Sequence, residues 1–138
     1  MTDTTNLERQ HQDFFDLIGK ITIYKSEQQV KDNAAAISLL LSQLSGKLNI
    51  HITTEDRFLY PDLMNHTNPK VKVMGQAFQS EMGGLAAAFV EFKNTFMTAS
   101  KISNQPGTFL IESQKVFKVL NNRIVRENKE LYPLLSVQ

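Results

Sequence analysis

The stretch HITTEDRFLYP, residues 51–61, returns in altered form as RIVRENKELYP at residues 123–133. The two copies share the frame x-Ile-x-x-Glu-x-x-x-Leu-Tyr-Pro. Most exchanges between them are mild, but His51 of the first copy becomes Arg123 in the second. The repeated frame predicts a chain built from two similar helix hairpins, and the exchanged histidine marks where the two hairpins differ in chemistry.

Apolar residues recur in alternating steps of three and four along four segments, which is the pattern of one buried face on an α-helix. These stripes lie within residues 7–21, 37–58, 78–96 and 109–134. No segment shows the strict alternation that is typical of a half-buried strand. Short connections between the stripes predict an all-α, up-down-up-down four-helix bundle, in which residues 1–138 form a single domain.

Patterns typical of helix ends separate the four stripes. A capping-box pattern at residues 26–29 predicts the start of the second helix, with Asp32 as an alternative start. Residues 65–69 predict a turn whose proline takes the first position of the third helix. Residues 103–107 predict the third connection.

The composition narrows the functional classes. The chain has no cysteine, which excludes disulfides, zinc–thiolate sites and thiol catalysis. A formal net charge of +1, without long runs of like charge, argues against nucleic acid or an acidic membrane as a partner. The first residues lack the features of a signal peptide, and no apolar run is long enough to span a bilayer. We therefore expect a cytoplasmic protein, and the sequence identifies no protein partner.

Polar residues and one methionine stand on the apolar stripes at matched positions. There are six of them: His11, His51, Glu55, Met82, Arg123 and Glu127. Buried polar groups are costly unless they are paired, so these residues are expected to converge in the interior of the bundle. Residues four apart share one helix face, so His51 and Glu55 can reach a common point. Imidazole and carboxylate groups from facing helices suit iron, manganese or zinc, and the pattern therefore indicates a metal site.

Each of these residues also has a plain structural interpretation. A single histidine on an apolar face, such as His11, is more often a hydrogen-bonded core residue than a ligand. Met82 typically fills a gap in a core, and Arg123 can form a simple intrahelical ion pair with Glu127. A phosphotransfer histidine would have to be exposed, whereas His11 and His51 both lie on apolar stripes. The sequence contains no convincing pair of nucleophile and base, so a hydrolase is not supported. We therefore expect a binding protein rather than an enzyme.

The stretches LERQHQDFFDLI, HITTEDRFLYP and RENKELYPLL resemble the hemerythrin-like (HHE cation-binding) family. The resemblance implies a four-helix bundle whose non-haem di-iron site is supplied by His, His-x-x-x-Glu, His and His-x-x-x-Glu. It carries four residues over as metal-ligand positions: His11, His51, Glu55 and Glu127. Glu81 is a candidate additional ligand if its helix rotates slightly. The likeness fails at Met82 and Arg123, which stand where the family has histidines.

The resemblance implies iron, in a mononuclear or dinuclear site, and a small diatomic ligand in oxygen, nitric oxide or iron sensing and handling. Because two family histidines are missing, reversible dioxygen carriage is expected to be absent or weak. A guanidinium is permanently cationic and binds carboxylates bidentately, so Arg123 can replace the charge of one metal ion between Glu55 and Glu127. Two hypotheses remain. One is a binding protein with a degenerate iron site, and the other is a metal-free interaction or regulatory module in which Arg123 closes the site.

Overall fold

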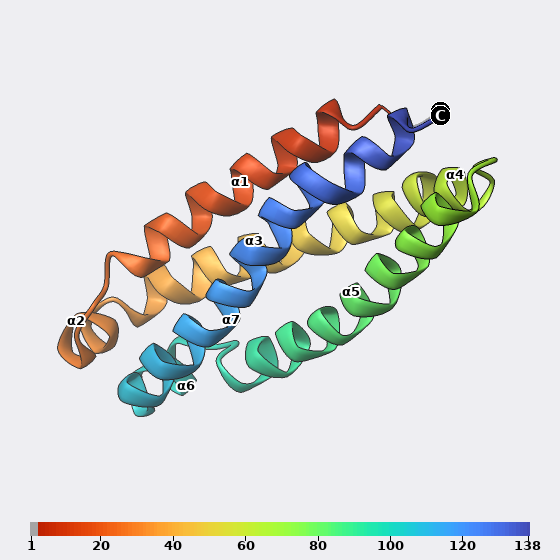
Figure 1. Ribbon diagram of the computed structural model, residues 1–138. Coiled ribbons are helices and arrows are strands. Elements are labelled where there is room, and N and C mark those ends of the chain that lie inside the picture. Colours follow the sequence, from red (N-terminus) through yellow and green to blue (C-terminus); the bar gives the residue numbers. More distant parts are fainter. Residues whose placement is uncertain (1–2) are drawn as a thin grey trace.

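Four long helical segments make up the computed structural model, which describes residues 3–138 (Figure 1). The first and third segments are single α-helices: α1 (Thr5–Thr22) and α5 (Pro69–Thr95). The second segment runs from α3 (Ala34–Thr54) through a π-helical turn (Glu55–Leu59) into α4 (Tyr60–Met64). The fourth runs from α7 (Pro106–Arg126) through a second π-helical turn (Glu127–Leu131) into a 3-10 helix (Tyr132–Ser136). No strand occurs in the described residues, and the predicted all-α fold is confirmed.

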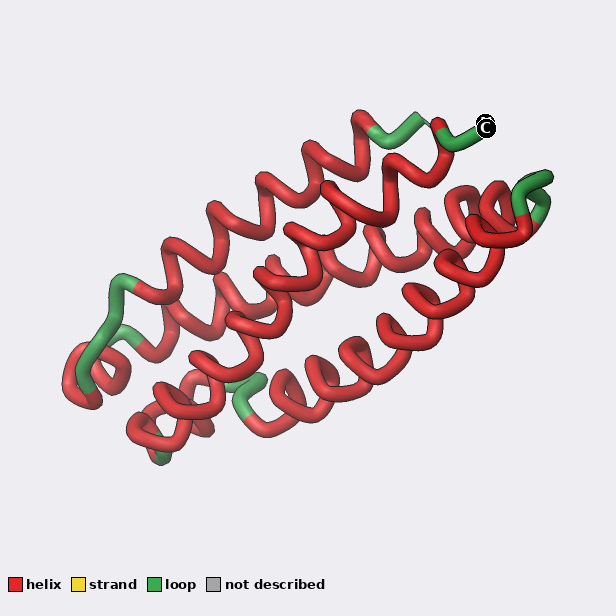
Figure 2. The backbone as a smooth tube through the Cα atoms, in the orientation of Figure 1, coloured by secondary structure: helices red, strands yellow, loops and turns green. Residues whose placement is uncertain are grey.

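The segments alternate in direction, as the up-down-up-down prediction requires. Helix α1 packs against α3 and helix α5 packs against α7. Loops are confined to the two ends of the bundle (Figure 2). The C-terminal residues lie at the same end as the turn between α4 and α5 (Figure 1). There, Nε2 of His66 lies 2.8 Å from the carbonyl oxygen of Val137, which ties this turn to the end of the chain.

Two short helices close the opposite end of the bundle, and the sequence did not predict them. The capping box at residues 26–29 is present, but it opens only α2 (Glu27–Asp32), and the long second helix begins at Ala34 instead. The third helix ends at Thr95, and a further short helix, α6 (Ala99–Asn104), precedes α7. Each short helix contributes one fully buried side chain to the core, Val30 in α2 and Ile102 in α6. Burying these two side chains is the physical reason why the connections are helical rather than open loops.

A layer of polar side chains divides the core into two apolar clusters. Along α1, Leu7 belongs to the smaller cluster and Phe14 to the larger one, with His11 between them. The second and fourth segments cross the same level with pairs of buried polar residues: His51 with Glu55, and Arg123 with Glu127. The prediction that these residues lie in the interior is therefore confirmed, and we call this level the polar layer.

The two π-helical turns coincide with the two copies of the repeated frame. In each, the backbone N–H of the frame's tyrosine bonds to the carbonyl five residues earlier, from Tyr60 to Glu55 and from Tyr132 to Glu127. In a regular α-helix a residue lies about 140° around the axis from the residue five positions before it. The wider π-helical turn brings that residue back toward the face of its glutamate. Both tyrosines are consequently buried beside the polar layer.

Candidate metal centre

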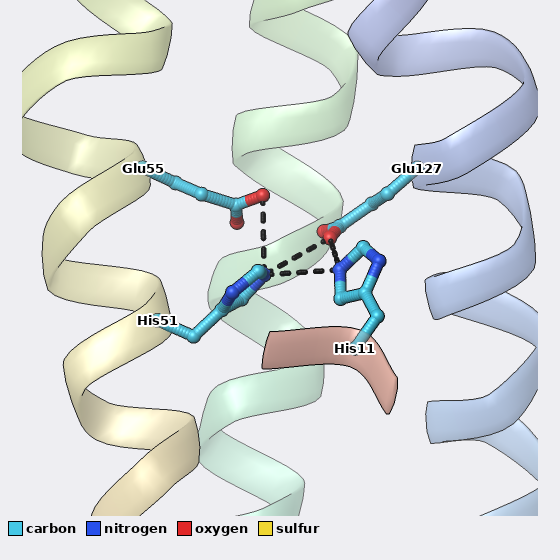
Figure 3. A group of neighbouring side chains, drawn as sticks. All are labelled: His11, His51, Glu55 and Glu127. Carbon is cyan, nitrogen blue, oxygen red and sulfur yellow. Dashed lines mark hydrogen bonds and ion pairs between the residues drawn. The ribbon is translucent and has the colours of Figure 1, made fainter. Parts of the chain in front are cut away.

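Two histidines and two glutamates converge in the polar layer (Figure 3). His11 comes from α1 and His51 from the last turn of α3, whereas Glu55 and Glu127 each begin a π-helical turn. One ligand atom of each residue lies within 4.8 Å of the others, and none of the four is more than 2% exposed. The structure thus brings together the four residues that the sequence predicted as metal ligands.

Both imidazole rings are held from behind by side-chain amides. Nδ1–H of His11 donates to Oδ1 of Asn128 at 2.8 Å, and Nδ1–H of His51 donates to Oε1 of Gln10 at 2.7 Å. Each ring therefore turns its Nε2 atom toward the centre of the cluster, and the two Nε2 atoms lie 3.1 Å apart. Metal-binding histidines have this arrangement, in which the outer N–H is fixed by a hydrogen-bond acceptor. Neither amide was predicted from the sequence.

Glu127 joins the histidines to the guanidinium of Arg123. Its Oε1 lies 2.8 Å from Nε2 of His11 and 3.2 Å from Nε2 of His51, while its Oε2 accepts a 2.8 Å bond from Nε of Arg123. Burial would raise the pKa of this carboxyl group. Hydrogen bonds from His11 and His51, together with the charge of Arg123, outweigh burial and hold the pKa of the carboxyl well below its usual range. Glu127 is therefore an anion with one oxygen facing each half of the polar layer.

Glu55 is less fully paired than Glu127. Its Oε2 accepts a 2.9 Å hydrogen bond from the Tyr132 hydroxyl and lies 3.3 Å from Nε2 of His51. Its Oε1 is buried and has no hydrogen-bond partner among the described residues. Burial raises the pKa of Glu55, and the bond to His51 offsets this only in part. Burial would lower the pKa of His51, but hydrogen bonds to Glu127 and Glu55 raise it to about 9.

Arg123 lies in the polar layer on the side of Glu127 opposite the two histidines, and it is only 3% exposed. Besides its bond to Glu127, it donates from Nη2 to the hydroxyl of Tyr60 at 2.9 Å. Its guanidinium carbon lies 4.8 Å from the centroid of the Phe78 ring, which favours a cation. Burial would lower the pKa of Arg123, but the charge of Glu127 raises it above its usual value, so the group stays cationic.

A comparison of the sequence with protein families identifies the scaffold. The family model of the hemerythrin HHE cation binding domain matches residues 2–135. The chain belongs to this family. No curated protein and no solved structure gave a match. The resemblance seen in the sequence is therefore confirmed, and it covers almost the whole chain.

Two positions depart from the ligand pattern of hemerythrin-like domains, and a third remains outside the cluster. Met82 is buried and belongs to the larger apolar cluster, while Arg123 forms the ion pair with Glu127. The Glu81 side chain is 49% exposed; it binds Arg126 and lies 3.6 Å from Nη1 of Arg123. Helix α5 therefore does not bring Glu81 to the group formed by the two histidines and two glutamates.

The hemerythrin-like cluster fits a metal ion. Two imidazoles with two carboxylates form a donor set that suits iron, manganese or zinc. Donors about 2.1 Å from a metal and at right angles to one another lie about 3.0 Å apart. The shorter donor–donor separations in the cluster range from 2.8 Å between His11 and Glu127 to 3.3 Å between His51 and Glu55. The unpaired Oε1 of Glu55 adds a further oxygen without a partner among the described residues.

Proposed function

We propose that this hemerythrin-like domain binds one iron ion through four residues: His11, His51, Glu55 and Glu127. The observation that carries the proposal is the 3.1 Å separation of two inward-facing Nε2 atoms, on rings whose Nδ1 atoms are already hydrogen-bonded to amide oxygens. Two imidazole lone pairs this close repel each other unless a proton or a metal ion lies between them. A metal ion would accept both lone pairs and draw in the two carboxylates as well.

Arg123 limits the proposed site to one metal. Its Nε binds Oε2 of Glu127 at 2.8 Å, on the opposite carboxylate oxygen from the one that faces the histidines. A second cation on that side would lie next to a permanently charged guanidinium in a buried environment, where like charges repel strongly. In this proposal Arg123 provides the charge that a second iron provides in a di-iron site.

The proposed physiological role is the binding of a small diatomic ligand, or of iron itself, in oxygen, nitric oxide or iron sensing and handling. The family membership and the buried ligand group support such a role for the domain. Binding rather than catalysis is proposed, and cytoplasmic localisation remains a prediction. Among residues 3–138, no helix combines the length and the apolar character that a membrane span requires.

Metal analysis of matched variants tests the proposal. Protein produced in iron-replete medium, and apoprotein titrated with iron(II) under argon, should contain about one iron per chain. His51→Ala should remove this binding, whereas His66→Ala should keep it, because His66 lies in the turn between α4 and α5 and is not part of the cluster. Wild-type protein that takes up no metal, or a His51→Ala variant that retains it, would overturn the proposal.

A specific observation also supports the alternative of a metal-free interaction or regulatory module. With the pKa of His51 raised to about 9, two cations, His51 and Arg123, balance two carboxylates, Glu55 and Glu127. The cluster is therefore electrically paired without a metal. This alternative predicts metal-free protein from iron-replete medium, with a melting temperature that neither chelator nor iron(II) changes.

A further inference from the structure

The hydroxyl group of Tyr132 lies close to all four of the proposed metal-ligand atoms. Its oxygen is 2.9 Å from Oε2 of Glu55 and 3.2 Å from Oε1 of Glu127. It is also 3.1 Å from Nε2 of His11 and 3.5 Å from Nε2 of His51. A single phenol oxygen is therefore within 3.5 Å of all four candidate ligand atoms.

We infer that Tyr132 is a fifth ligand, which coordinates the metal ion through its phenolate oxygen. The inference rests on the proposed function, because it assumes that the cluster binds a metal. The second π-helical turn ends at Leu131, and Tyr132 follows it directly as the first residue of the 3-10 helix, so the fourth segment carries both Glu127 and Tyr132 to the cluster. No movement of the backbone is required to bring the oxygen into the group.

The spacing supports coordination rather than exclusion. The phenol oxygen lies 2.9–3.5 Å from the four ligand atoms, and those atoms lie 2.8–3.3 Å from their nearest neighbours in the cluster. Five donors at such mutual distances can surround one ion at about 2.1 Å. The hydroxyl group has a single proton, which it can donate to Oε2 of Glu55 or to Oε1 of Glu127, so hydrogen bonding by that proton does not account for all four close approaches.

The charges of the polar layer point in the same direction. A divalent metal with Glu55 and Glu127 is neutral, and Arg123 then leaves one excess positive charge in a buried region. Glu81 lies 3.6 Å from Arg123 but is half exposed, so it compensates this charge only weakly. A phenolate at Tyr132 would restore neutrality. On binding, the O–H bond is replaced by an O–metal bond, and the proton passes to the buffer.

The other copy of the repeat provides a matched control. Tyr60 occupies the same place after Glu55 as Tyr132 does after Glu127. Its hydroxyl accepts a 2.9 Å bond from Nη2 of Arg123 rather than contacting the histidines. Removing the Tyr60 hydroxyl therefore perturbs a buried phenol of the same repeat without removing the proposed ligand.

Optical spectroscopy of iron-loaded protein tests the inference. Wild type, Tyr132→Phe and Tyr60→Phe are loaded with one equivalent of iron(II) under argon, oxidised with ferricyanide, desalted and analysed for iron per chain. A phenolate bound to iron(III) gives a charge-transfer band in the visible region, and excitation in this band enhances phenolate vibrations in the Raman spectrum. We expect wild type and Tyr60→Phe to show both signals and Tyr132→Phe to lose them. We also expect Tyr132→Phe to bind iron(II) about tenfold or more weakly than wild type.

The outcomes separate this inference from the proposed function. One iron per wild-type chain without the band, a band that persists in Tyr132→Phe, or tighter iron binding by Tyr132→Phe would each show that the phenol is not a ligand. The proposed metal site would survive all three results. A wild-type chain that binds no iron would instead overturn the proposed function, and the inference with it.

Discussion

Replacing Arg123 with alanine should destabilise the protein more than any substitution of an exposed charge. The guanidinium is buried, donates 2.8 Å and 2.9 Å hydrogen bonds to Glu127 and Tyr60, and lies over the Phe78 ring. Its removal leaves the Glu127 carboxylate without its permanently charged partner and leaves the Tyr60 hydroxyl without its donor. An uncompensated buried charge is the costly result of breaking such a pair.

The expected loss is about 3–5 kcal/mol in the free energy of unfolding of metal-free protein at neutral pH. For a chain of this size, each 1 kcal/mol corresponds to about 3–4 °C in melting temperature. The melting temperature of Arg123→Ala in chelator should therefore be about 10–20 °C below that of wild type. Iron(II) should rescue much of this loss, because a bound cation supplies the charge that Glu127 has lost.

The stability difference between wild type and Arg123→Ala should depend on pH because of Glu127. Its folded-state pKa is lowered, so the stabilisation it contributes is present above the usual glutamate value of 4.5 and is lost as the pH falls through the folded-state pKa. Arg123→Ala removes part of that stabilisation. The gap between variant and wild type should therefore be full at neutral pH and narrow progressively below pH 4.5.

Thermal melts of wild type, Arg123→Ala and Arg126→Ala, each with chelator and with iron(II), provide the test. Arg126 is the matched control, since it lies on the same helix and over the same Phe78 ring but is half exposed and pairs with Glu81 and Glu130. Its loss should cost at most about 1 kcal/mol, as is usual for exposed pairs. If Arg123→Ala melts like wild type in chelator at neutral pH, Arg123 does not neutralise Glu127 and its assigned role is wrong.

Three further predictions concern the metal and the histidines. The free energy of unfolding in chelator, measured with denaturant from pH 6 to 9.5, should fall as the pH rises through about 9. The pKa of His51 is raised in the folded state, so its contribution to stability is fully present below pH 6.5 and is lost at higher pH. A flat profile would contradict this. Iron(II) at 100 times its dissociation constant should stabilise wild type by about 2.7 kcal/mol, seen as a higher melting temperature that chelator reverses; His51→Ala should show no such shift. The double substitution Met82→His with Arg123→His should raise the bound iron from one to two per chain by metal analysis, and a ratio that stays at one would show that more than these two side chains limits the site.

The sequence predicted the bundle and the cluster because both follow from helical periodicity. Helices that keep one face buried over many turns leave a clear stripe, and the polar interruptions at His11, His51 and Arg123 stand out against it. The short helices α2 and α6 left no such signal. Each buries one apolar side chain, Val30 or Ile102, and a single buried residue has no period.

The two tyrosines were missed for a different reason. Counted along a regular α-helix, the fifth residue after each glutamate points away from the cluster, so neither Tyr60 nor Tyr132 lies on its stripe. The π-helical turns change this direction, and no periodicity rule anticipates them. A signal was present, because the repeated frame keeps its tyrosine in both copies. Gln10 and Asn128 left none, since polar residues beside a stripe are usually solvent-exposed.

The difference between the two copies can now be interpreted in terms of charge. Each copy contributes one buried carboxylate, and two buried carboxylates require two cations nearby. In the second copy the cation is part of the chain, because Arg123 is always charged. In the first copy His51 offers either a proton, in the metal-free state, or a lone pair to a metal ion. On the proposed assignment one cation is therefore permanent and the other exchangeable, so iron competes with protons for the same half of the polar layer. The exchange of histidine for arginine then reduces a site for two metals to a site for one, and it ties the occupancy of that site to pH.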